Sequence, residues 1–297
     1  MTSLQTADIT QAVLDRLADS TDARFKEVIS AVIRHVHALA REVDLKPDEW
    51  MAAVQFLTRA GQTCDAKRQE FILLSDTLGL SMLVVQLEQA RRARDSAASA
   101  AAPATPATEA TVQGPFYWAG SPELPLGADI GEGAGTPAYY SGRVTDTRGQ
   151  PVANCCLDVW SGDGEGFYDM QRGDDAPMRL RARFRTDAQG RYHFWSIKPY
   201  YYPVPDDGPV GAMLRKMGRH PNRPGHIHMM VYADGCVPLT THLFDADSPY
   251  LDSDAVFGVR DSLIVKYDQK APGTAPDGRV MDRPFHTASF DFVLALA

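Results

Sequence analysis

The stretch RRARDSAASAAAPATPATEA, residues 91–110, separates two parts of the chain that have different sequence patterns. It consists mainly of alanine, proline, serine and threonine, so we interpret it as a linker or a surface excursion. Helical patterns precede it, and strand-like runs separated by turn signals follow Thr111. The chain is therefore predicted to have an α+β fold, with a helical domain over residues 1–110 and an antiparallel β-sandwich domain over residues 111–297.

Three helical segments are expected before this stretch. Over residues 20–39, apolar residues recur at steps of three and four, which indicates an amphipathic helix. A second helix is expected to begin at Pro47, because proline suits the first turn of a helix. Residues 68–87 predict a third helix or a broken pair, since Gly79 interrupts the run.

The second part is expected to be built from short strands. Residues 140–144, 156–160 and 191–197 are strand-like runs that are separated by turn signals. The chain ends with apolar residues at every second position over residues 290–296, which predicts a last strand with one buried face.

Composition narrows the classes of function. The 297 residues include 30 Lys and Arg against 38 Asp and Glu, a net charge of −8 that disfavours nucleic acid as a partner. No apolar run approaches the roughly 20 residues of a membrane span, and the first residues lack the pattern of a signal peptide. A cytoplasmic location is therefore expected. The four cysteines form no CxxC pair and are interpreted as reduced thiols.

Two histidines and a group of tyrosines are candidates for chemistry. His226 and His228 flank Ile227 in a segment with strand character, so both imidazoles project from one face and could chelate one metal ion. Taken alone, the pair leaves a metal site and a packing role equally open. Tyr168 lies in a glycine-rich turn, and residues 200–202 are three tyrosines that precede a proline-rich loop.

Two histidines and two tyrosinates would favour a particular metal. A phenolate is a hard anionic ligand whose free pKa is about 10, so a strongly acidic cation is needed to deprotonate it near neutral pH. Zinc prefers cysteine, histidine and carboxylate, and ferrous oxygenases commonly use two histidines and one carboxylate. The donor set therefore favours ferric iron.

The sequence resembles the intradiol ring-cleavage dioxygenases over essentially the whole chain. The matching segments are TVQGPFY (111–117), LDVW (157–160), GFYD (166–169), YPVPDDGPVG (202–211), GRHPNRPGHIH (218–228) and LTTH (239–242). The two tyrosines are 34 residues apart and the second lies 24 before the first histidine. The resemblance implies one non-haem Fe(III) per chain, with the ligands Tyr168, Tyr202, His226 and His228. It selects Tyr202 because this residue stands six before Gly208, as the family ligand does.

Within this family the chain is most similar to the branch that cleaves hydroxyquinol, benzene-1,2,4-triol. The features are TLGLSML after Asp76, His242 where catechol enzymes usually have glutamine, and residues 248–264. The branch implies cleavage between the two ortho hydroxyls with O2 to 3-hydroxy-cis,cis-muconate and maleylacetate, in aromatic catabolism. A catechol or chlorocatechol 1,2-dioxygenase is the alternative within the family. Gly225 departs from the alanine common there, which is expected to alter packing rather than chemistry.

The resemblance also implies roles around the metal. Arg223 would stabilise negative charge on the ring, unless it forms only a structural ion pair. Tyr202 would leave the metal and accept a substrate proton. His242 would hydrogen-bond the activated substrate or pack, and Asp76 would accept a hydrogen bond from the third hydroxyl or be a helix-surface charge. The positions that match walls of the substrate pocket are Leu73, Gly114, Pro115, Phe116, Val204, Pro205 and Val256.

The apolar helical stripe exceeds what one sandwich face requires, and in the family such helices form a homodimer interface where a lipid is often found. A ferric dioxygenase would be wine-red from phenolate-to-iron charge transfer. Two other classes stay open on the residues alone: a zinc hydrolase that uses the two histidines, which would be colourless, and a non-enzymatic β-sandwich module whose tyrosines stack on sugars or aromatics.

Overall fold

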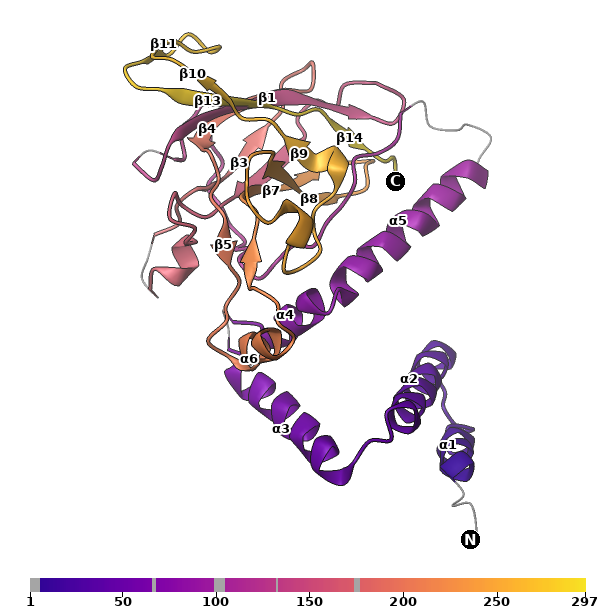
Figure 1. Cartoon of the computed structure of the whole chain (residues 1–297). Helices are drawn as coiled ribbons and strands as arrows, with labels where there is room; N and C mark the ends of the chain where they lie inside the picture. The colour runs from indigo at the N-terminus through magenta and orange to yellow at the C-terminus, as the bar shows by residue number, and fades with distance from the viewer. Residues whose placement is uncertain (1–5, 66–67, 99–104, 132, 174–176) are drawn as a thin grey trace. The chain divides into compact units, whose positions relative to one another are not determined.

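Five α-helices precede the first strand in the computed structural model of the chain, which describes residues 6–65, 68–98, 105–131, 133–173 and 177–297 (Figure 1). Their bounds are Thr6–Asp15 (α1), Ala23–Glu42 (α2), Pro47–Thr63 (α3), Glu70–Thr77 (α4) and Leu80–Ala98 (α5). The chain divides into two compact units, residues 1–59 and 60–297, so α4 and α5 belong to the same unit as the strands. The functional division at residue 110 stays a prediction.

Gly79 separates α4 from α5, as the sequence predicts. Its φ of +77° lies in the left-handed region that favours glycine. No single helix among the described residues is long and apolar enough to cross a membrane; α4 and α5 pass that test only as a pair, bent by 70°.

The first part of residues 91–110, predicted to be a linker or a surface excursion, is helical instead of irregular. Residues 91–98 continue α5, because alanine and arginine are strong helix formers even where they have nothing to bury. Residues 99–104 lie outside the described part of the chain. From Thr105 the chain follows the sandwich without regular structure, and the amide of Thr108 donates to the Val293 carbonyl at 2.9 Å.

Most regular elements after residue 136 are short strands, which include the predicted ones over residues 140–144, 156–160 and 191–197, while the strand predicted over residues 290–296 is limited to residues 292–294. The bounds are Pro137–Asp146 (β1), Cys156–Trp160 (β2), Arg181–Arg185 (β3), Arg191–Ile197 (β4), Tyr202–Pro203 (β5), Asn222–Arg223 (β6), His226–Tyr232 (β7), Leu239–Asp245 (β8), Ile264–Val265 (β9), Asp268–Lys270 (β10), Gly273–Thr274 (β11), Val280–Met281 (β12), Phe285–Ser289 (β13) and Phe292–Leu294 (β14). Helix α6, Pro209–Lys216, which the sequence analysis missed, lies between β5 and β6. It packs against α4.

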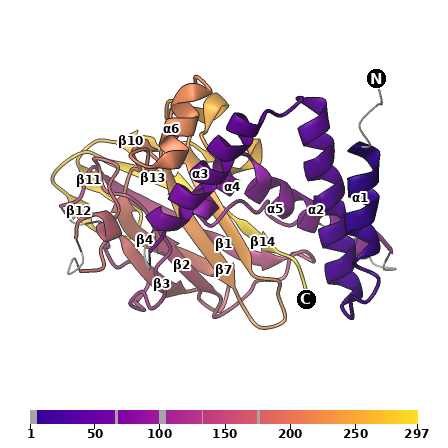
Figure 2. The same ribbon diagram turned by 90° about the horizontal axis from the view of Figure 1, so that it is seen from below.

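Two five-stranded sheets form the β-sandwich. One has the order β3-β2-β7-β8-β9, and the other has β10-β13-β1-β14 with β4 paired to β1. Most pairs are antiparallel, as expected for this fold, but β1 pairs in parallel with β13 and β14, and β8 with β9. Figure 2 shows β2 and β7 side by side, seen from below.

Alternation along the strands decides which side chains leave the core. In β7, Ile227, Met229 and Val231 are buried in the core between the sheets. His226 and His228 therefore lie on the opposite face of the same sheet. Trp160 of β2 is the cross-strand partner of His228, and so is His242 of β8. The sheet thus brings two histidines from one strand and one from the next to a single outer face.

Candidate metal centre and active site

Four donor atoms predicted as metal ligands converge on the outer face of this sheet. The Nε2 atoms of His226 and His228 are 3.2 Å apart. The Tyr168 hydroxyl lies 2.8 Å from His228 Nε2, and the Tyr202 hydroxyl lies 3.5 Å from His226 Nε2. The two hydroxyl oxygens are 3.4 Å apart. All four side chains are buried, so the structure assembles the set that the resemblance implied.

The spacing of these atoms fits one metal ion. Donor atoms about 2.0 to 2.2 Å from a common centre lie roughly 2.8 to 3.6 Å apart when they subtend about 90° to 109°. Two phenolates and two neutral imidazoles would neutralise two of the three charges of a trivalent ion. The residues present therefore fit ferric iron.

Burial sets the protonation of the donors before any metal binds. It lowers the pKa of His226 and His228 well below the usual value, and the positive charge of Arg223 acts in the same direction. Both imidazoles are thus neutral and can ligate. Burial also raises the pKa of Tyr168 well above the usual value, so this phenol keeps its proton until a strongly acidic cation displaces it.

His242 is a third imidazole in the same cluster. Ring nitrogens of His226, His228 and His242 lie within 4.8 Å of one another, which by itself would suit a three-histidine metal site. However, His242 Nε2 lies 2.8 Å from Nδ1 of His228, and its Nδ1 lies 2.5 Å from the Thr111 hydroxyl. Both nitrogens of His242 therefore have protein partners, and the contacts favour the tyrosines as ligands. A direct contact between His242 and substrate stays a prediction.

Tyr168 is held in place by a neighbour that the sequence analysis did not single out. Asp169 forms a buried ion pair with Arg181, whose Nε lies 2.6 Å from Asp169 Oδ2. Arg181 also donates to the Phe116 carbonyl at 3.2 Å, and the Phe116 ring stacks on Tyr168 with centroids 4.4 Å apart. One buried ion pair thus fixes the turn that carries Tyr168 and the aromatic wall beside it.

Tyr202 and Arg223 are direct partners across the short β5–β6 ribbon. Next to this ribbon, the backbone at Gly225 passes close to the backbone at Pro199. A Cβ at Gly225 would lie 2.7 Å from the Pro199 carbonyl oxygen. The departure at Gly225 therefore affects packing, as expected, and it lets the segment before Tyr202 pass next to the start of β7.

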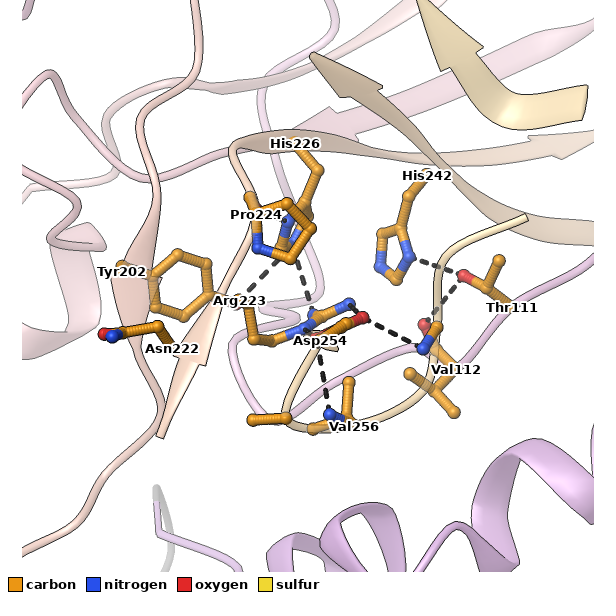
Figure 3. A network of polar contacts seen from close by, with 12 residues as sticks. Thr111, Val112, Tyr202, Asn222, Arg223, Pro224, His226, His242, Asp254 and Val256 are labelled. Carbon is orange, nitrogen blue, oxygen red and sulfur yellow. Dashed lines mark hydrogen bonds and ion pairs between the residues drawn. The ribbon is translucent and has the colours of Figure 1, made fainter. Parts of the chain in front are cut away.

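Arg223 is both an ion-pair partner and a charge at the metal site. Its Nε lies 3.0 Å from Asp254 Oδ1, and its Nη1 lies 3.2 Å from His226 Nε2 (Figure 3). Burial alone would lower the pKa of Arg223, but the Asp254 carboxylate together with Tyr202 and Tyr168 outweighs it, so this pKa lies above the usual value. Arg223 thus forms the structural ion pair that was expected as an alternative to a role at the ring. Its guanidinium still faces the donor atoms of the metal site.

The other residues that were predicted to contact the substrate lie at different distances from the donor atoms of the metal site. A Cβ at Gly114 would lie 3.5 Å from the His228 ring, which places this residue at the metal site. Val256 lies beside the Arg223–Asp254 pair in Figure 3. Asp76 is buried in α4 rather than exposed on the helix surface, close enough for Arg223 to influence its pKa. Leu73, Phe116 and Val204 are buried, and Pro115 and Pro205 are half-buried.

Sequence reasoning missed five residues that hold the site: Thr111, Trp160, Asp169, Arg181 and Asp254. Trp160 stacks on His228 with centroids 4.6 Å apart at 11°. Asp169 had a local signal, since it directly follows Tyr168. Thr111 and Trp160 stand in the matching segments 111–117 and 157–160 but were not singled out. Arg181 and Asp254 reach the site through strand pairing or loop packing, which local sequence patterns do not reveal.

Comparison with known proteins shows the family of the chain. A family model described as "Dioxygenase" matches residues 112–295, and one described as "Catechol dioxygenase N terminus" matches residues 22–96. The hydroxyquinol 1,2-dioxygenase of Rhizobium sp. (strain MTP-10005) is 44% identical over 96% of this chain and 94% of its own length. The 6-chlorohydroxyquinol 1,2-dioxygenase of Cupriavidus pinatubonensis is 44% identical over 97% and 96%.

Solved structures show the same likeness. The hydroxyquinol 1,2-dioxygenase from Pseudomonas putida DLL-E4 superposes with a TM-score of 0.85 and 42% identity, over 98% of this chain and 99% of that one. The catechol 1,2-dioxygenase from Pseudomonas arvilla C-1 gives 0.83 and 30%, over 100% and 93%. With the two domain models in order along the chain, the protein belongs to the intradiol ring-cleavage dioxygenases.

Proposed function

We propose that the protein is a ferric dioxygenase that cleaves hydroxyquinol between its two ortho hydroxyls. The observation that carries this proposal is the convergence of Tyr168, Tyr202, His226 and His228. The hydroxyl oxygens and Nε2 atoms of these side chains form contacts of 2.8 to 3.5 Å. The names of the relatives, hydroxyquinol and chlorohydroxyquinol dioxygenases, support the substrate. Benzene-1,2,4-triol takes up both atoms of O2 to give 3-hydroxy-cis,cis-muconate, which ketonises to maleylacetate.

The metal would be held by these four side chains, one ion per chain. When bound, ferric iron would supply Lewis-acid chemistry that activates the aromatic diol toward O2. The protein residues bind, orient and move protons. Tyr202 would accept a proton from a substrate hydroxyl, and Arg223, fixed by Asp254, would stabilise the negative charge that develops on the ring.

Substrate selection is assigned to the pocket wall and to Asp76. Phe116 and Val256, with the other predicted wall residues, would grip a flat ring and keep water out. Burial raises the pKa of Asp76, while Ser81 and Arg223 oppose this shift. Ser81 already hydrogen-bonds the Asp76 carboxyl group, and the third hydroxyl of hydroxyquinol would add a hydrogen bond that catechol cannot make.

Oxygen consumption with hydroxyquinol and catechol, measured side by side, tests this function. We expect a wine-red protein that consumes O2 faster with hydroxyquinol. Faster turnover of catechol would move the chain to the catechol branch, and a colourless zinc protein without oxygen uptake would refute ring cleavage. In Asp76→Leu, the ratio of kcat/KM for hydroxyquinol to that for catechol should fall roughly 10- to 100-fold, since about 1 to 3 kcal/mol is at stake.

The N-terminal helices are proposed to form a homodimer interface, with a lipid between them. Apolar side chains on α2 stay exposed, such as Phe25 at 57% and Val36 at 56%, and no residue described in α2 is buried. Sedimentation showing only monomers at micromolar concentration would exclude the dimer, and mass spectrometry of a solvent extract tests the lipid. The cytoplasmic location stays a prediction.

A further inference from the structure

A line of hydrogen bonds leads away from the metal site through three buried side chains. His228 Nδ1, on the side of the ring away from the other donors, lies 2.8 Å from His242 Nε2. His242 Nδ1 lies 2.5 Å from the Thr111 hydroxyl oxygen, and Figure 3 shows these two side chains facing each other. The Thr111 hydroxyl in turn donates to the Val112 carbonyl at 3.4 Å. The exposed fractions of Thr111, His228 and His242 are at most 2%.

The carbonyl at the end gives this line a direction. A carbonyl oxygen can only accept, so a hydroxyl that donates to it must accept from Nδ1–H of His242. A neutral His242 with its proton on Nδ1 has an acceptor at Nε2, which then receives Nδ1–H of His228. His228 is thereby left with a lone pair on Nε2, the atom that faces Tyr168 and His226.

The reverse direction of these hydrogen bonds would prevent His228 from binding the metal. If the Thr111 hydroxyl donated to His242 Nδ1, His242 would carry its proton on Nε2 and donate to His228 Nδ1. The proton of His228 would then sit on Nε2, where the metal must bind. The choice between the two directions is a choice between a competent and a blocked ligand.

His226 needs no such relay. Its Nδ1 lies 2.7 Å from the Pro224 carbonyl, which fixes the Nδ1–H tautomer directly. His228 lies within β7 opposite His242, so an imidazole rather than a carbonyl meets its Nδ1. The backbone around the relay is also pinned, because the amide of Thr111 donates to the Thr240 carbonyl at 2.9 Å.

We propose that Thr111 is a positioning residue that acts through His242 to hold His228 in the Nδ1–H tautomer and so prepares Nε2 for the metal. This inference rests on the proposed ligand set and not on the identity of the substrate. It also gives His242 a role that needs no contact with substrate.

Imidazole ¹⁵N chemical shifts of the metal-free protein read the tautomer directly, without turnover. In the unaltered protein we expect His228 with its proton on Nδ1. In Thr111→Val, which removes the hydroxyl and keeps the shape, we expect a proton on Nε2 or a mixture. The affinity for Fe(III), measured by competition with citrate, should fall about 10- to 100-fold, as is typical when such a partner is lost.

Three variants separate positioning from general damage. Thr111→Ser keeps the hydroxyl and should restore both the tautomer and the affinity. His242→Gln should also retain them, because its amide can accept from His228 and donate to Thr111. Thr241→Val removes another buried hydroxyl, which donates to the Glu109 carbonyl at 2.8 Å, and should change neither readout.

An unchanged His228 tautomer and unchanged Fe(III) affinity in Thr111→Val would overturn the proposal, provided that thermal unfolding shows a folded protein. Equal losses in Thr111→Val and Thr111→Ser would overturn it too, since the hydroxyl would then not be the cause. A protein that binds Fe(III) through this relay but cleaves no diol would refute the proposed function and leave the relay standing.

Discussion

Arg223 binds Asp254 with two of its nitrogens and directs the third at the metal site. Nε and Nη2 of Arg223 lie 3.0 and 3.3 Å from the two Asp254 oxygens, and Nη1 lies 3.2 Å from His226 Nε2. Asp254 is itself held by the amides of Val256 and Gly258. A Cβ at Gly258 would lie 2.9 Å from Arg223 Nη2, so this loop closes tightly over the guanidinium. The loop therefore determines where the positive charge stands.

Asp254→Asn is expected to damage stability and catalysis together. It leaves the buried Arg223 charge without a counter-charge, which costs about 3 to 5 kcal/mol in the free energy of unfolding. Urea unfolding measures this loss, and kcat should fall because the guanidinium is no longer fixed beside His226. A stability equal to that of the unaltered protein would show that Asp254 does not hold Arg223.

The double variant Arg223→Met, Asp254→Leu serves as the control for this pair. Replacing both members of a buried ion pair by apolar residues is often neutral for stability. We expect the double variant to recover much of the lost stability and none of the lost kcat. Recovery of both would remove Arg223 from the mechanism.

Asp169→Asn should release Tyr168. The change leaves Arg181 buried without its counter-charge, so the free energy of unfolding should fall by about 3 to 5 kcal/mol. The charge-transfer band of the iron-loaded protein should weaken, because the turn that holds Tyr168 loosens. Glu165→Gln is the matched control, since the ion pair of Glu165 with Arg172 on the same turn is exposed. A similar loss of the band in both variants would contradict this anchoring role.

The order of elements could be read from the sequence because their signals are local. Pro47 begins α3, Gly79 breaks α4 from α5, and alternation marks the strands. The helical part of the predicted linker, residues 91–98, was missed because residues with nothing to bury can still be good helix formers. Helix α6 was missed because its proline-rich approach resembles a loop.

The spacing of His226 and His228 indicated a candidate metal-binding pair, but the full ligand set came from the resemblance, which supplied the choice of Tyr202 among three adjacent tyrosines. The supporting contacts are not local. Thr111 and His242 are 131 residues apart, and Arg223 and Asp254 are 31 apart. Strand register and loop packing bring these pairs together, and neither is encoded in a short motif.

Asp76 predicts a pH dependence of stability. Burial raises its folded pKa above the unfolded value of about 3.9. Between the two values the folded state holds more protons than the unfolded state, so the free energy of unfolding decreases as pH rises. Asp76→Asn removes this term. The Tm of the variant relative to the unaltered protein should thus increase with pH across the window that starts near 4, as thermal melts in matched buffers can measure. A constant difference would mean that Asp76 has an ordinary pKa.

Glu70 ties the start of α4 to the start of α6, which follows the loop that leaves Tyr202. Its side chain is fully buried, accepts the Val210 amide at 3.0 Å and pairs with Arg68 at 3.0 Å. Glu70→Ala leaves an amide at the α6 N-terminus without its acceptor, and the free energy of unfolding should fall by about 2 to 3 kcal/mol in urea. The loss stays below that of a fully buried pair because Arg68 is 26% exposed and can be hydrated.

Glu70→Gln should lose less than Glu70→Ala, since one amide oxygen can still accept from Val210. Glu88 is the control, because it forms ion pairs with two arginines, Arg91 and Arg92, on the surface of α5, so Glu88→Gln should be indistinguishable from the unaltered protein. If Glu70→Ala unfolds at the same urea concentration as Glu88→Gln, the buried carboxylate does not join these helices. If it does join them, loosening α6 should also raise KM for hydroxyquinol, because Val204 and Pro205 of the proposed pocket wall lie on the loop that α6 anchors.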